Sequence, residues 1–253
     1  MRRIVVANQK GGVAKSSTVL NVAWSLQRRG QRVLVVDVDP QANATSGFVG
    51  MEQPEPTLYE VFEGDTSLAE TLVPVADGLD LVPGSLDLAD ADFLYAARLG
   101  RESILAKALN KVTKSRKRSY DFVILDTPPF LGLLTANAFL AAQEVLIPVT
   151  PSLWAMRGIA KLEAHLERVR ADLSHDLRLL GAVAQMVDNT LVSRDALDIL
   201  REHFGDRLFA ATIPRTVRME EANAAAESIF THAPGSPAAQ AYDNLTEEIL
   251  SRG

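Results

Sequence analysis

Short runs of Val, Ile and Leu recur along this 253-residue chain, and longer stretches with helical periodicity separate them. The clearest runs cover residues 3–7, 32–37, 122–126, 145–149 and 179–187, and weaker ones cover 79–82 and 209–213. Such continuous apolar runs are typical of parallel strands buried on both faces. Helical patterns lie near residues 15–29, 133–142, 155–172, 194–204 and 237–250. The alternation predicts an α/β fold: a doubly wound, mostly parallel sheet flanked by helices on both faces.

The composition favours one cytoplasmic domain over residues 1–253, because no linker-like or low-complexity tract divides the chain. The absence of cysteine excludes disulfides, thiolate metal sites and iron–sulfur ligation by this chain. No signal-type segment and no apolar run of roughly 18 residues is present, so we expect no membrane anchor. The net charge of −6 taken alone argues against nucleic-acid binding, but local basic groups decide such binding.

The segment 8–18, Asn-Gln-Lys-Gly-Gly-Val-Ala-Lys-Ser-Ser-Thr, follows the first apolar run and opens a helical pattern. Backbone N–H groups of a glycine-containing loop at a helix N-terminus bind phosphate. Lys15 is placed to reach the β- and γ-phosphates, and the Ser16 hydroxyl is placed to bind Mg²⁺. We therefore expect a P-loop-type nucleotide site, with contacts from Lys10, Gly11, Gly12, Val13, Ala14, Lys15, Ser16 and Ser17.

This loop departs from the strict pattern G-x-x-x-x-G-K-[ST], because Gln9 and Ala14 occupy the two glycine positions. If position 14 requires a positive φ, alanine there costs on the order of 1 kcal/mol. A plain glycine turn between a strand and a helix is the alternative interpretation. It accounts less well for the Lys15–Ser16 pair and for the acidic residues that follow.

Acidic residues end two further apolar runs. Asp37 and Asp39 follow the second run, and Asp126 ends the run 122–126, as in a Walker B strand. One acid of the first pair is suited to orienting a water ligand of Mg²⁺, and the other to positioning the attacking water. Asp126 is suited to the Mg²⁺ shell, and Thr127 begins a loop that senses the γ-phosphate. Solvated acids in an Asp-Pro turn are the alternative for the first pair.

Four segments together resemble the ParA/Soj family of DNA-partitioning ATPases, which carry a deviant Walker A loop. They are residues 8–18, 36–47, 120–129 and 213–222, and the resemblance spans essentially the whole chain. The resemblance implies ATP and Mg²⁺ as cofactors. It implies that Lys10 reaches across an ATP-sandwich dimer to the partner's phosphates and that Gly11 allows the subunits to approach.

The same resemblance implies further roles. Lys15, with Lys10 and Asp39, would form the catalytic group, and Asp39 would position the hydrolytic water. Ser16, Asp39 and Asp126 would serve the metal, and Pro214 would pack near the adenine. The chain departs from the family at Ala14, which replaces a glycine, and at residues 188–193, which lack the family's arginine.

Two basic groups are candidates for non-specific DNA contact. Arg215 and Arg218 match family positions that contribute to it, although solvated helix-end arginines are the alternative. The run at residues 114–118 supplies Lys114, Arg116, Lys117 and Arg118, and a solvated loop is the alternative there. Because the chain starts at its first strand, we expect no N-terminal helix-turn-helix domain and no sequence-specific binding.

The leading hypothesis is a ParA-type DNA-segregation ATPase that forms a homodimer on ATP binding, acts on the nucleoid and is reset by a ParB-like partner. A ParA-like ATPase that positions a protein cargo is an alternative that sequence barely separates. A MinD-like membrane ATPase is disfavoured, because the C-terminal helical segment is acidic rather than basic. A metabolic ligase of the dethiobiotin-synthetase kind would not need Lys10 or the paired arginines.

Overall fold

The computed structural model describes residues 1–52, 54–113, 119–152, 155–173 and 175–252. Its centre is an eight-stranded sheet in the order β3-β4-β2-β5-β1-β6-β7-β8. The strands are β1 (Arg2–Val6), β2 (Val33–Asp37), β3 (Val73–Ala76), β4 (Leu79–Val82), β5 (Phe122–Asp126), β6 (Glu144–Val149), β7 (Arg178–Val187) and β8 (Leu208–Pro214). Neighbouring strands are parallel except β3, which runs antiparallel to β4.

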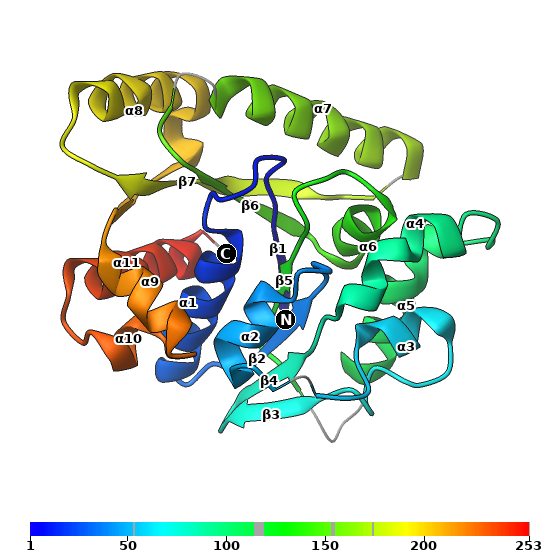
Figure 1. Cartoon of the computed structure of the whole chain (residues 1–253). Coiled ribbons are helices and arrows are strands. Elements are labelled where there is room, and N and C mark those ends of the chain that lie inside the picture. The colour runs from blue at the N-terminus through cyan, green and yellow to red at the C-terminus, as the bar shows by residue number, and fades with distance from the viewer. Residues whose placement is uncertain (53, 114–118, 153–154, 174, 253) are drawn as a thin grey trace.

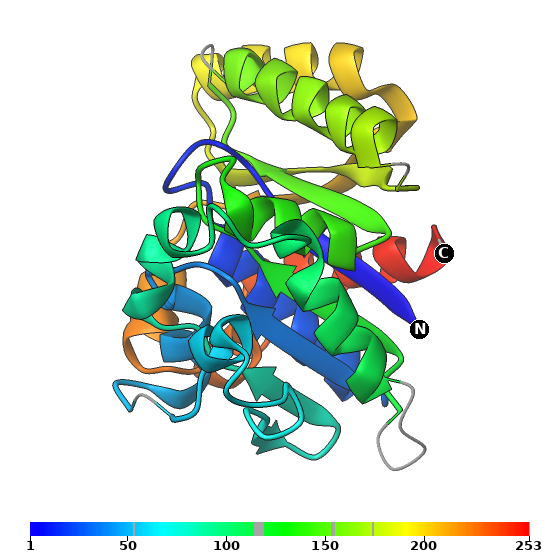
Figure 2. The same ribbon diagram turned by 90° about the vertical axis from the view of Figure 1, so that its right-hand side faces the viewer.

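Helices cover both faces of this sheet (Figures 1 and 2). The α-helices are α1 (Lys15–Arg28), α2 (Asn43–Val49), α3 (Leu58–Glu63), α4 (Ala91–Leu94), α5 (Ile104–Thr113), α6 (Leu133–Ala141), α7 (Ala155–Leu173), α8 (Leu191–Phe204), α9 (Val217–Ala224), α10 (Ile229–His232) and α11 (Pro237–Ser251). Short 3₁₀ turns occupy Leu86–Asp90, Arg101–Ser103 and Gly205–Arg207. In the part of the chain described here, no helix has the length and apolarity needed to cross a bilayer.

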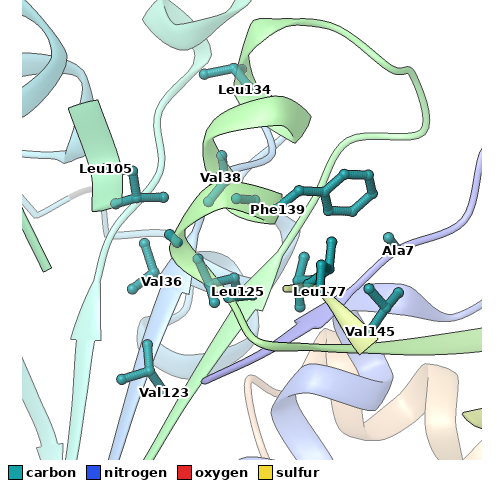
Figure 3. Packing of buried hydrophobic residues seen from close by; sticks show 14 of the residues in the cluster. Ala7, Val36, Val38, Leu105, Val123, Leu125, Leu134, Phe139, Val145 and Leu177 are labelled. Atoms are coloured by element: carbon teal, nitrogen blue, oxygen red, sulfur yellow. The ribbon is translucent and has the colours of Figure 1, made fainter. Parts of the chain in front are cut away.

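Two apolar cores lie on opposite faces of the sheet. Alternate residues of β5 supply them: Val123 and Leu125 pack with α5, α6 and α7, whereas Phe122 and Ile124 pack with α1 and α11. Figure 3 shows the first core, where Phe139 of α6 lies over side chains of β2, β5 and β6. A strand that is buried on both faces has no polar side, which explains the continuous apolar runs in the sequence.

The predicted fold class is confirmed, and every predicted strand is present. The edge strand β3 was not predicted; it is four residues long and contains Pro74, which edge strands tolerate because one side needs no partner. Helix α8 begins at Leu191, earlier than predicted, because the Thr190 side chain accepts a hydrogen bond from Ser193 N and caps it. Helices α2, α3, α4, α5, α9 and α10 also lie outside the predicted set.

Strand order places the chemically informative segments together. Strand β5 lies between β1 and β2, and Asp126 pairs in register with Val6 on one side and Asp37 on the other. The loop after β1, the acidic residues after β2 and the end of β5 therefore meet at one edge of the sheet. This is the carboxyl edge, where ligands bind in open α/β sheets.

Candidate nucleotide-binding site

A cavity of about 460 Å³ opens at the carboxyl ends of β1, β2 and β5. Residues singled out from the sequence that line it are Gly11, Gly12, Ala14, Lys15, Ser16, Ser17 and Asp39. Val13 instead points into the protein and is 1% exposed. Lys10 is exposed, and the described lining residues do not include it. The structure thus brings together most of the predicted phosphate site and leaves one of the two lysines outside it.

The loop between β1 and α1 is fixed by hydrogen bonds to the neighbouring strand. The Asn8 side-chain amide donates to Pro148 O at 2.8 Å, and its Oδ1 accepts from the backbone N–H of Lys10 at 3.0 Å. Gly12 has φ 69°, and Ala14, which precedes α1, has φ 63° and ψ 38°. Position 14 therefore has the left-handed conformation that favours glycine, although its residue is alanine. For alanine this conformation costs roughly 1–2 kcal/mol.

Lys15 begins α1 and lines the cavity, although its side chain is only 7% exposed. Burial lowers the pKa of its ammonium group, and the carboxylates of Asp126 and Asp39 partly oppose that effect. A buried cation at a helix N-terminus adds to the positive end of the helix dipole. The wall of the cavity at Lys15 therefore suits a multiply charged anion such as a polyphosphate.

The two acids after β2 have different environments. Asp37 is fully buried, and its Oδ2 accepts from both the backbone N–H and the hydroxyl of Thr45 at 2.7 Å. Burial raises the pKa of Asp37 to about 6, even though these hydrogen bonds favour the ionised form. Asp39 lines the cavity and accepts from Gln41 N at 3.0 Å. Of these two acids, only Asp39 lines the cavity, whereas Asp37 is held beneath it by Thr45.

Asp126 ends β5 beneath the cavity and is fully buried. Its Oδ1 accepts from Thr127 N at 3.0 Å, whereas Oδ2 has no hydrogen-bond partner among the described residues. Burial raises the pKa of Asp126 well above its usual value, and the charge of Asp37 adds to this, while the Ser16 hydroxyl lowers it. A buried carboxylate oxygen without a partner needs a proton or a cation beside it.

These residues fit Mg²⁺ that is bound together with phosphate. In the described ranges, no three His, Asp or Glu side chains form a ready metal cluster. A cation here would depend on Asp126, on the Ser16 hydroxyl and on oxygens of the ligand. Mg²⁺ typically binds through one or two protein groups plus phosphate oxygens and water, so the donor set suits that ion.

A second cavity, of about 120 Å³, lies beside the first. It is lined by Gln185 and Met186 at the end of β7, by Pro214 and Arg215 at the end of β8, and by Met219 of α9, among others. Ala14, Ser17 and Asn223 line both cavities. The apolar walls and the position next to the phosphate loop suit a nucleotide base, and Pro214 is among the residues that line this cavity.

The candidate DNA residues are placed unequally. Arg215 and Arg218 are exposed after β8, at the same edge of the sheet as the cavities. The Arg218 guanidinium forms an ion pair with Glu221 at 2.9 Å, and its side chain remains 61% exposed. The other group, Lys114, Arg116, Lys117 and Arg118, falls outside the described residues.

Sequence reasoning missed several contributors. Thr45, which holds Asp37, lies eight positions further along, and its hydroxyl also accepts from Gly84 N at 2.9 Å. Asn223 is 206 positions from Ser17, yet its amide lies 3.3 Å from the Ser17 hydroxyl. Thr45 lies in the segment 36–47 that already resembled the family, so a signal was present there. Asn223 carries no such pattern.

Comparisons with known proteins agree with this geometry. A family model described as an AAA domain matches residues 1–179. The chromosome-partitioning ATPase Soj of Thermus thermophilus is 45% identical over 253 residues, covering 100% of this chain and 96% of the relative. The chromosome partitioning protein ParA of Caulobacter vibrioides is 36% identical, covering 100% and 95%.

Solved structures show the same architecture. A structure described as cobyrinic acid a,c-diamide synthase from Mycobacterium smegmatis, with a bound ATP analogue and magnesium, has a TM-score of 0.82 at 34% identity and covers 98% of this chain and 93% of its own. A plasmid partition protein from Borrelia burgdorferi bound to AMPPNP has a TM-score of 0.85 at 24% identity, covering 100% and 99%, and supports the fold alone. On the full-length similarity to Soj and ParA, the chain belongs to the ParA/Soj family of partitioning ATPases.

Proposed function

We propose that this protein is a DNA-segregation ATPase that binds Mg²⁺ and ATP at the larger cavity and dimerises with ATP at the interface. The observation that carries the proposal is that two lysines of one loop lie in different positions relative to the cavity. Lys15 is buried against the phosphate site, whereas Lys10 is exposed and lies outside the cavity of its own chain. An exposed lysine five positions before a buried one is suited to a second subunit's nucleotide.

Exposed apolar side chains near the cavity support an association surface. Leu86 is 66% exposed and Phe130 is 45% exposed. Phe130 directly follows Pro129, which lines the cavity, and Leu86 follows β4 at the same edge. Exposed large apolar groups that gather near a ligand site mark protein–protein contacts more often than free surface. A dimer closed over ATP would cover them.

Hydrolysis in this proposal depends on Asp39 and Asp126. Mg²⁺ supplies charge neutralisation for the phosphates when it is bound. Asp39 lines the cavity with one carboxylate oxygen fixed by Gln41 N, so its other oxygen is available to orient water toward a γ-phosphate. Asp126 would hold the metal shell through its buried carboxylate. Lys15 neutralises charge that develops on the phosphate oxygens.

DNA binding in this proposal is non-specific and belongs to the dimer. Arg215 and Arg218 lie at the nucleotide edge, so closing a dimer there would place two copies of the pair on one assembly. Arginine contacts to phosphate give affinity without reading bases. A ParB-like partner would stimulate hydrolysis and release the protein from DNA, which would make it nucleoid-associated only in its ATP state.

Two variants of the same loop test the proposal. Lys10→Ala should abolish dimerisation on ATP while leaving ATP binding by the monomer within about twofold, because Lys10 serves the other subunit's nucleotide. Lys15→Ala is the matched control and should lose both. Dimerisation would be measured by light scattering and ATP binding by equilibrium titration. A Lys10→Ala protein that still dimerises on ATP would contradict the sandwich arrangement.

A cargo-positioning ATPase would use the same site and the same cycle. DNA retention therefore separates cargo positioning from DNA segregation only in part. An amide-forming synthase is suggested by the description of the Mycobacterium smegmatis structure. Partition is favoured because the relative with that role is more similar, at 45% identity over the whole chain.

A further inference from the structure

A one-directional chain of hydrogen bonds connects α11 to the phosphate loop through the protein interior. The Tyr242 hydroxyl donates to Gln185 Oε1 at 3.4 Å, and the Gln185 Nε2 group donates to Thr18 Oγ1 at 2.9 Å. The Thr18 hydroxyl in turn donates to the carbonyl oxygen of Ala14 at 2.6 Å. Thr18 and Tyr242 are 0% exposed and Gln185 is 1% exposed. Bonds aligned in this way polarise one another, so each strengthens the next.

The direction of the chain follows from its chemistry. A hydroxyl carries a single hydrogen, and the amide nitrogen of Gln185 can only donate. The Thr18 oxygen must therefore accept from Gln185, which leaves the hydroxyl hydrogen for Ala14 O. Without Gln185, the Thr18 oxygen loses this amide donor, and its hydroxyl hydrogen is directed less firmly to Ala14 O.

The end of the chain is the strained position of the phosphate loop. Ala14 has φ 63° and ψ 38°, and as an alanine it has no side-chain oxygen with which to cap α1. Its carbonyl oxygen accepts twice, from Thr18 N at 2.9 Å and from the Thr18 hydroxyl at 2.6 Å. The first bond belongs to any helix start, and the second is of a kind that helical threonines often form, as Thr113 and Thr246 do here. What is particular to Thr18 is the buried donor behind its oxygen, which strengthens the bond to Ala14 O. Strained conformations persist where the surroundings over-determine them.

We propose that Gln185 is a positioning residue for nucleotide binding: through Thr18 it holds Ala14 in the left-handed conformation that the phosphate loop requires. This inference rests on the proposed binding of ATP. Gln185 and Ala14 also line the same small cavity, so the chain runs along the junction between the base side and the phosphate side of the site. The protein thereby keeps a phosphate-loop shape at a position where a glycine would adopt it without strain.

A double-mutant cycle tests this role, with ATP dissociation constants and melting temperatures measured for each protein. Gln185→Leu in the natural background should raise the ATP dissociation constant about fivefold, the ratio that corresponds to ~1 kcal/mol of left-handed alanine. In an Ala14→Gly background the same change should raise it less than about twofold, because glycine adopts positive φ at no steric cost. Asn137→Leu is a matched control, since Asn137 is also a buried amide with hydrogen bonds and lies on α6. It should lower the melting temperature and leave ATP binding unchanged.

Rescue by Ala14→Gly would support the positioning role. If Gln185 only touched the nucleotide or only stabilised the core, a glycine at position 14 would not restore ATP binding. An unchanged dissociation constant in Gln185→Leu, or the same loss in both backgrounds, would overturn it. If Gln185→Leu does not fold, Tyr242→Phe removes only the first donor of the chain, and about a twofold loss with the same rescue is then expected. If the natural protein binds no ATP, the proposed function is overturned. If it binds ATP but Ala14→Gly does not rescue the Gln185→Leu variant, only this inference is overturned.

Discussion

We expect the buried carboxyls at the strand ends to make the nucleotide-free protein more stable at mildly acidic pH than at neutral pH. Burial raises the pKa of Asp37 to about 6 in the folded chain, against an ordinary value of 3.8. Its folded-state pKa is raised, so the folded protein holds a proton that the unfolded chain has already lost. The contribution of Asp37 to stability is therefore complete only below about pH 4 and is lost as the pH rises through 6. The pKa of Asp126 is raised too, and its contribution has the same sign.

The size of the effect follows from the shift of Asp37. A difference of roughly 2 pKa units corresponds to about 2 kcal/mol between pH 4 and pH 7, of which about 1 kcal/mol falls between pH 5 and pH 7. His165 opposes this trend weakly, because burial lowers its pKa and acid then destabilises the fold. Surface carboxyls with lowered pKa, such as Glu70 and Glu221, act only at more acidic pH.

Urea unfolding of the nucleotide-free protein at several pH values measures this directly. Asp37→Asn is the control, because it removes the titrating group and the charge that raises the pKa of Asp126. The natural protein should lose about 1 kcal/mol or more of unfolding free energy from pH 5 to pH 7, and the variant should lose less. Mg²⁺ with ATP should flatten the trend, since a cation favours the ionised carboxylate. Stability that rises from pH 5 to pH 7, or an equal trend in both proteins, would refute this reasoning.

Three further predictions concern the site and its surroundings. Asp39→Ala should slow ATP hydrolysis at least about 100-fold while ATP still binds, and rapid turnover of ATP by this variant would contradict its role. Gly84→Ala should lower the free energy of unfolding in urea by about 1–3 kcal/mol through overpacking, because its Cβ would lie 2.9 Å from Asp37 O. An unchanged unfolding midpoint would mean that the backbone there moves to make room for the methyl group. Arg218→Glu should weaken ATP-dependent DNA retention and reduce its salt dependence. Arg201→Glu is the control for that change, since Arg201 is similarly exposed and paired but lies on α8; equal losses in both variants would exclude a specific DNA face.

The fold could be predicted from sequence because its strands are buried on both faces. Runs such as 122–126 are therefore almost purely apolar, and each ends in a polar segment that marks the carboxyl edge of the sheet. The edge strand β3 has no such signal, because it is short, partly exposed and interrupted by Pro74. The start of α8 depends on a single capping bond from Thr190, which hydrophobic periodicity does not report.

The candidate site could be predicted only where its residues are contiguous. The loop 8–18 and the positions Asp39 and Asp126 each carry a local pattern. The contact of Gln185 with Thr18 spans 167 positions, and it depends on the pairing of strands and helices that no local pattern specifies. The burial of Asp37 was missed for a similar reason, because α2 must fold back to bring Thr45 over it.

Coupling of nucleotide state to assembly is the central claim, and one measurement tests it most directly. A DNA gel shift on unrelated sequences, paired with a mass measurement in solution, should be made with ATP, with ADP and without nucleotide. The account predicts a dimer and DNA retention only with ATP, independent of sequence and weakened steeply by salt. A protein that has the same mass and the same DNA affinity in all three conditions would contradict it.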